Sequence, residues 1–129
     1  SPFFRKNPSF GGIFFIYTFV YKVYLIEIND IVKRYKIGWT KKDVQQRLKQ
    51  LQTGAHSELN VLYVFESKWG SKIESILHRK YSSNKTSGEW FNLSEEDVTN
   101  FRNNCQKAHN DLEMMWRENS WVQEKGRFS

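Results

Sequence analysis

Runs of β-forming residues are separated by turn signals in the first half of the chain. Val23–Ile26 is the core of a strand, Asn29–Asp30 makes a turn, and Arg34–Gly38 predicts a short returning strand. Leu59–Phe65 is again dense in valine, leucine and aromatic residues, which favour strands. The pattern therefore predicts a β-hairpin and one further strand.

Helical spacing of apolar residues predicts two helices between and after these strands. Apolar positions recur over Lys41–Gln52, Thr40 can cap that helix, and Thr53–Gly54 ends it. A second helix is predicted from about Gly70 to Tyr81. The polar segment Ser82–Gly88 follows, and we expect it to be a mobile surface loop.

The C-terminal part of the chain has the pattern of one long helix. Ser94 can cap it, and three acidic residues follow in the first turn, where the helix dipole favours anions. Apolar residues from Val98 to Met115 then alternate spacings of three and four, which makes one narrow apolar seam that includes Cys105. We expect this helix to pack on the domain or on a second copy of the chain, as a homodimer.

The 129 residues fit one domain with additions at both ends. Residues 1–12 hold two prolines and a glycine pair and predict a flexible leader. Residues 13–93 then form the globular domain, residues 94–119 the C-terminal helix, and residues 120–129 a tail.

Composition narrows the class of protein. The chain is 39% hydrophobic and 26% charged, which is typical of a globular domain and too apolar for a disordered tail. Its longest apolar run, from Ile13 to Ile28, is interrupted by Lys22 and Glu27 and falls short of the roughly 20 apolar residues of a spanning helix, so we expect no membrane segment. A single cysteine, Cys105, excludes an internal disulfide framework and favours an intracellular location.

The net charge of +6 is concentrated in one segment. Seven basic residues and one acid lie between Lys33 and Lys49, whereas the rest of the chain is neutral. Such a cluster can bind a polyanion such as DNA, with Lys41 and Lys42 as the candidate contacts, or it can be a solvated helix face. Phosphate-cradling, dinucleotide-type and nucleophile-elbow motifs are absent from the sequence, which excludes most common enzyme classes.

Five short motifs occur in a recognisable order. They are Val23–Ile26, Tyr35–Thr40 (Tyr-Lys-Ile-Gly-Trp-Thr), Arg47–Gly54 (ending Leu-Gln-Thr-Gly), Glu74 with Leu77-His78, and Gly88–Phe91 (Gly-Glu-Trp-Phe). In this order they resemble the GIY-YIG nuclease superfamily, and most closely its phage and stand-alone microbial branch with Lys-Ile-Gly in the second motif. The resemblance covers about Val23 to Leu93.

The resemblance implies an α+β fold with a small three-stranded antiparallel sheet flanked by helices. It also implies a metal-dependent endonuclease that hydrolyses DNA phosphodiester bonds with Mg²⁺ or Mn²⁺. Two alternatives remain: a catalytically inactive nucleic-acid-binding module of the same fold, and a dimerisation unit that uses the C-terminal helix.

The resemblance assigns Tyr24 and Lys36 to the activation of water. A tyrosine has an ordinary pKa near 10, so it needs a nearby positive charge to act as a base at neutral pH. Lys36 is the nearest candidate, and it stands where the superfamily's second motif is named for a tyrosine. The alternative for Lys36 is a solvated lysine on a short strand.

Two further residues match a phosphate contact and a metal ligand. Arg47 matches the arginine that binds the scissile phosphate, and its forked guanidinium suits phosphate oxygens. Its alternative is a salt bridge to Asp43. Glu74 matches the metal-binding glutamate, and its alternative is an ion pair with Lys72 or His78.

His56 and Asn92 complete the candidates. His56 lies in the loop after the first helix, where some relatives place a catalytic histidine, but ordinary loop histidines are common. Asn92 matches a late asparagine near the phosphate. His78 and Glu89 belong to the motifs, although the sequence gives neither a role.

Overall fold

The computed structural model describes residues 20–128, and the side chains of residues 20–119. The predicted leader (residues 1–12) and the start of the predicted domain (residues 13–19) lie outside the described residues. So do the side chains of the predicted tail.

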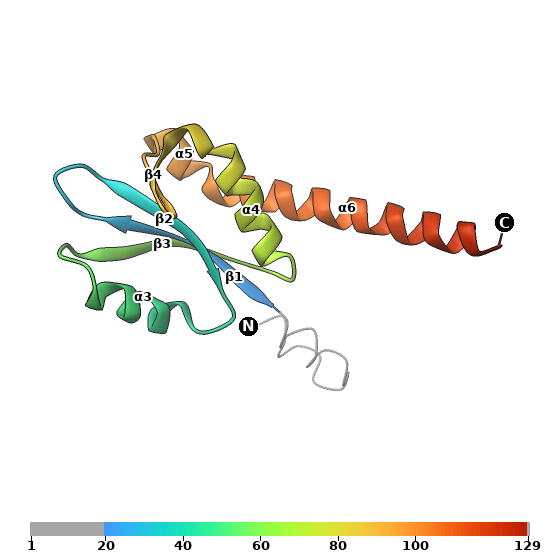
Figure 1. Cartoon of the computed structure of the whole chain (residues 1–129), viewed down its shortest axis with the longest axis horizontal. Coiled ribbons are helices and arrows are strands. Elements are labelled where there is room, and N and C mark those ends of the chain that lie inside the picture. Colours follow the sequence, from blue (N-terminus) through green and yellow to red (C-terminus); the bar gives the residue numbers. More distant parts are fainter. Residues whose placement is uncertain (1–19, 129) are drawn as a thin grey trace.

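A five-stranded antiparallel sheet forms the centre of the domain (Figure 1). Its strands are β1 (Tyr21–Ile28), β2 (Arg34–Thr40), β3 (Leu59–Ser67), β4 (Lys85–Ser87) and β5 (Trp90–Phe91), and they lie in the order β3-β1-β2-β5-β4. The α+β class and the three predicted strands are confirmed.

The prediction of only three strands is wrong, because the segment after the second helix adds β4 and β5 to the edge of β2. Tyr35 pairs with Phe91 and Lys36 with Trp90, and the Phe91 side chain is fully buried. Burial of that ring fixes the segment against β2. Ser82–Gly88, predicted as a mobile loop, accordingly forms a turn of 3₁₀ helix (Ser82–Asn84) and β4.

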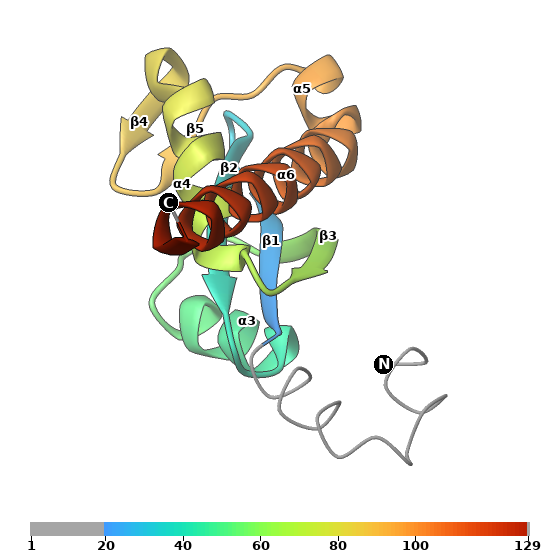
Figure 2. The same ribbon diagram turned by 90° about the vertical axis from the view of Figure 1, so that its right-hand side faces the viewer.

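Helices cover both faces of the sheet. α3 (Val44–Thr53) lies alone on one face, whereas α4 (Gly70–Lys80) and α6 (Phe101–Phe128) pack against each other on the opposite face (Figures 1 and 2). The cap predicted for α3 is wrong by three residues. Asp43, not Thr40, accepts the Gln45 N–H at 3.0 Å, and Thr40 instead accepts the Lys42 N–H within the turn.

The C-terminal helix is confirmed, but it has a break near its start. α5 (Glu95–Thr99) begins with a capping box between Ser94 and Asp97, and Asn100 then separates it from α6. α6 extends beyond the sheet (Figure 1). Met114 and Trp116 of this helix are exposed. The homodimer through this helix stays a prediction. No helix in the described part of the chain is long and apolar enough to cross a bilayer.

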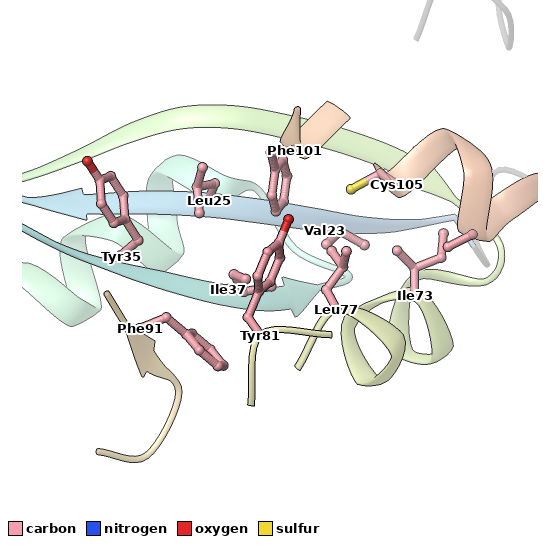
Figure 3. Close-up of a cluster of buried hydrophobic side chains, with 11 residues drawn as sticks. Val23, Leu25, Tyr35, Ile37, Ile73, Leu77, Tyr81, Phe91, Phe101 and Cys105 are labelled. Atoms are coloured by element: carbon pink, nitrogen blue, oxygen red, sulfur yellow. The ribbon is translucent and has the colours of Figure 1, made fainter. Parts of the chain in front are cut away.

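Two hydrophobic clusters hold the layers together. The larger lies between the sheet and the helices α4 and α6, and Phe101 and Cys105 of α6 contribute to it (Figure 3). Burial raises the pKa of the Cys105 thiol to about 12, so this cysteine is the small buried residue that the sequence predicts. The smaller cluster lies under α3 and includes Tyr24, Ile26 and Val44.

Candidate active site

The site is built around a change in pairing along β2. β5 pairs with β2 only at Tyr35 and Lys36, and the next contact is the Ile37 N–H with the Glu89 carbonyl at 3.4 Å. Beyond Ile37, the described residues provide no further strand on this side of β2. Side chains from both faces of the sheet can therefore approach this edge of β2.

Tyr24 reaches toward this edge across Gly38. The two residues are paired in the β1–β2 ladder, and a Cβ on Gly38 would lie 2.6 Å from the Tyr24 Cζ. Only a glycine leaves room for the tyrosine ring to cross β2 at this point. Tyr24 is almost completely buried, on the face that α3 covers.

Lys36 lies on the same face of β2 as Gly38, because alternate residues of a strand share a face. Its Nζ donates to Glu89 Oε2 at 2.6 Å and lies 5.6 Å from the centre of the Trp90 ring. The Lys36 side chain is only 9% exposed, so the alternative of a solvated lysine is wrong. A buried ammonium needs such a partner, and Glu89 supplies it from the turn before β5.

Glu74 and His78 approach β2 from the opposite face, on successive turns of α4. Glu74 Oε1 lies 3.7 Å from His78 Nε2. The same nitrogen lies 2.8 Å from the Ile37 carbonyl oxygen, which can only accept, so Nε2 carries the proton in this arrangement. His78 thereby anchors α4 to the middle of β2 and holds Glu74 beside the strand edge.

The carboxylates of Glu74 and Glu89 form a cluster with His78. One ligand atom from each of the three residues lies within 4.8 Å of the other two. Burial raises the pKa of Glu74. His78 and Lys36 lower it, and the negative charge of Glu89 raises it further. Charged groups from both faces of the sheet thus shift the pKa of one carboxyl group.

Arg47 lies half-buried on α3, and its Nη1 donates to Gln50 Oε1 at 3.2 Å. The predicted alternative, a salt bridge to Asp43, is not formed, because the Asp43 carboxylate caps α3. No hydrogen bond or ion pair among the described residues joins Arg47 to the carboxylate cluster.

Other predicted residues lie in separate places. His56 is exposed and lines a cavity of about 370 Å³ with Arg34 and Trp90, near the β1–β2 turn. Asn92 is exposed just beyond β5, and its backbone N–H donates to the Asn84 carbonyl at 2.8 Å. The structure joins neither side chain to the carboxylate cluster by a hydrogen bond or ion pair within the described residues.

The basic segment is divided by β2. Lys33 and Arg34 lie at one end of the strand, where they form ion pairs with acids of the hairpin at 4.0 and 3.9 Å. Lys41 and Lys42 are exposed in the turn at the other end. β2 has seven residues, so the two groups are about 20 Å apart and do not form one patch.

A family model, the T5orf172 domain, matches residues 17–106, which is more than two thirds of the chain. The chain belongs to the T5orf172 domain family. The T5orf172 domain is phage-associated and belongs to a nuclease-related group, which is consistent with a nuclease or DNA-binding role. No curated protein and no solved structure matches the chain.

The T5orf172 match spans all five strands and every candidate site residue from Tyr24 to Asn92. The sequence motifs include Glu89 and His78 but give neither residue a role, although both belong to the cluster. The signals were present: His78 follows Glu74 by one helical turn, and Glu89 is the acid directly before an aromatic pair. The ion pair from Glu89 to Lys36 joins residues 53 positions apart, which local patterns do not predict.

Proposed function

We propose that this T5orf172 domain is a metal-dependent endonuclease that hydrolyses DNA phosphodiester bonds. The proposal is carried by the meeting of Glu74 and Glu89 at one edge of β2. Tyr24 and Lys36 approach the same edge from the other face of the sheet. The resemblance of five ordered motifs to GIY-YIG nucleases supports the same activity.

The carboxylate cluster fits a divalent cation. Its ligand atoms lie within 4.8 Å, close to the roughly 4 Å between opposite ligands of one Mg²⁺ ion. The raised pKa of Glu74 reports unfavourable burial of negative charge, which a cation would offset. Glu74 and Glu89 would hold the ion, because the protonated Nε2 of His78 is occupied by the Ile37 carbonyl. Bound Mg²⁺ or Mn²⁺ would polarise the phosphate and stabilise the leaving oxygen.

The protein's own groups would handle the proton and the phosphate. Hydrolysis forms a bond from the water oxygen to phosphorus, breaks a bond from phosphorus to a sugar oxygen, and requires a group that takes the water proton. Tyr24 and Lys36 activate the water, and the Tyr24 phenol oxygen accepts that proton. Arg47 binds the scissile phosphate once DNA lies against α3.

The remaining candidates belong to DNA binding. Lys41 and Lys42 contact backbone phosphates from the turn before α3, and Asn92 contacts the substrate beyond β5. His56 stays a second candidate base, at the cavity that it shares with Trp90.

The test is incubation of the purified chain with supercoiled plasmid and Mg²⁺ or Mn²⁺, beside an EDTA control. The proposal predicts nicked or linear product that depends on the metal ion. Binding of plasmid in a gel-shift assay without any cleavage would contradict it and favour the inactive binding module.

A further inference from the structure

Trp39 is an exposed aromatic residue beside the carboxylate cluster. It is 38% exposed, whereas its neighbours on the same face of β2, Tyr35 and Ile37, are buried. Exposing part of an indole to water is unfavourable and is common where a surface binds a partner. The two buried neighbours pack in the core under α4, so Trp39 stands where that core ends.

The indole is held in place by packing. The rings of Tyr21 and Trp39 meet edge to face, with centres 5.3 Å apart and planes at 84°. The Tyr21 Cβ in turn packs against Gly70 at the start of α4, where a Cβ on residue 70 would collide with it. A flat ring fixed in this way can bind another flat ring at a low entropic cost.

Positive charge surrounds this aromatic pair. Lys41 Nζ lies 5.3 Å from the centre of the Tyr21 ring. Lys22 Nζ donates to the carbonyls of Lys41 and Lys42 at 3.4 and 3.2 Å. None of these three lysines forms an ion pair with a carboxylate of the described residues. Aromatic rings flanked by unpaired lysines are suited to bases and phosphates of nucleic acid.

Trp39 is close to the cluster along the strand. Ile37, whose carbonyl contacts His78, lies two residues before it on the same face, about 7 Å away. A base stacked on Trp39 would therefore leave its neighbouring phosphate near Glu74 and Glu89.

We propose that Trp39 stacks an unpaired DNA base and so selects substrates that contain an unpaired nucleotide. The inference rests on the proposed nuclease function and names its substrate class. In a regular duplex the faces of the bases are covered by their neighbours, so the indole could reach them only at a single strand, flap, gap or bulge.

The test is fluorescence anisotropy with the full chain in EDTA, using a labelled 12-nucleotide single strand and the blunt duplex that it forms with its complement, which contains no unpaired nucleotide. Trp39→Ala should weaken binding of the single strand by roughly 5- to 150-fold, since one base stack contributes about 1–3 kcal/mol. Binding of the duplex should change by less than about 2-fold. Trp39→Phe, which keeps a ring, should retain most of the affinity.

Trp116→Ala is the matched control, because Trp116 is also exposed but lies on α6. Circular dichroism and melting temperature verify that each variant is folded. An equal loss for both ligands, or no loss for the single strand, would overturn the inference. Because the assay needs no cleavage, an inactive protein that still prefers single strands through Trp39 would refute only the nuclease proposal.

Discussion

Gly38 determines how the tyrosine reaches the site. Its missing side chain is the space that the Tyr24 ring fills, and the motif Lys-Ile-Gly therefore has a physical reason for its last residue. The requirement is one of close approach and not of backbone conformation, since Gly88 is the one described glycine with a positive φ.

Substitution of Gly38 should disrupt both packing and activity. Gly38→Ala places a methyl group inside the Tyr24 ring, which should lower the free energy of unfolding by about 1–3 kcal/mol, as overpacking does, and reduce DNA cleavage. Urea denaturation and a cleavage assay measure the two effects. Gly54→Ala is the control, because a Cβ there meets no atom within 4 Å. Equal behaviour of the two variants would show that Tyr24 does not occupy this space.

Glu74 should make stability depend on pH. Its pKa in the folded protein lies above the ordinary 4.5, chiefly through burial, so ionisation of Glu74 destabilises the fold. The loss of stability caused by this ionisation is absent below the pKa of Glu74 in the unfolded chain. It grows as the pH rises between the unfolded-state and folded-state pKa values, and it is complete above the folded-state pKa. Glu74→Gln carries no such cost. We expect it to melt at a higher temperature than the parent at pH 7–8 and at the same temperature near pH 4, when both are followed by circular dichroism without metal. A difference that stays constant with pH would contradict this account.

At the scale of elements, the attachment of β5 to β2 creates the site. β5 supplies only two ladder pairs, and the Lys36–Glu89 ion pair lies directly where this pairing ends. The ion pair thus both holds β5 against β2 and sets the position of one carboxylate of the cluster.

Loss of the Glu89 charge should therefore destabilise the protein, in contrast to loss of the Glu74 charge. Glu89→Gln leaves the buried Lys36 ammonium without its counter-ion, and we expect the free energy of unfolding at pH 7 to fall by about 1–2 kcal/mol. This is less than for a fully buried pair, because Glu89 is 43% exposed to water. Glu27→Gln is the control, since its pair with the exposed Lys33 is long, at 4.0 Å. If Glu89→Gln is as stable as that control, the ion pair does not hold β5 in place.

The sequence predicts elements well where a segment carries its own periodicity. The strands at Val23–Ile26, Arg34–Gly38 and Leu59–Phe65 and the helix at Gly70 are of this kind. β4 and β5 are three and two residues long, too short for any periodic pattern, and they exist because the chain docks on an existing edge. The site is predicted only in part for a similar reason. The motifs identify Glu74 and Lys36 as candidates, but local patterns do not predict the contacts between residues far apart in the sequence that bring the site together.

At the scale of the whole molecule, the charge of the basic segment is distributed over two ends of β2. Only the end with Lys41 and Lys42 lies beside Trp39 and the free edge of β2, and its lysines are not paired with acids of the described residues. DNA binding should therefore depend on this end of the strand.

A pair of charge-reversal variants tests this division. Lys41→Glu with Lys42→Glu should weaken binding to unrelated DNA sequences alike and reduce the slope of log affinity against log salt by about 2, or roughly 1 for each lost phosphate contact. Lys33→Glu with Arg34→Glu changes the charge equally at the opposite end and should alter the slope less. The slopes are measured by anisotropy between about 50 and 200 mM salt. Over this range the affinity of proteins with many phosphate contacts changes by about 10³-fold. Equal slopes for the two double variants would show that long-range charge alone governs binding.

DNA cleavage by this domain should require a metal ion held by the carboxylates of the cluster. The most direct measurement is single-turnover cleavage of labelled DNA by Glu74→Gln beside Glu118→Gln, an exposed glutamate of α6, over a titration of Mg²⁺. We predict that Glu118→Gln cuts at the parent's rate. Glu74→Gln should fold and bind DNA but cut about 100-fold more slowly or worse, because several kcal/mol of transition-state stabilisation is lost. Cleavage by Glu74→Gln at the parent's rate and the parent's Mg²⁺ dependence would contradict the account.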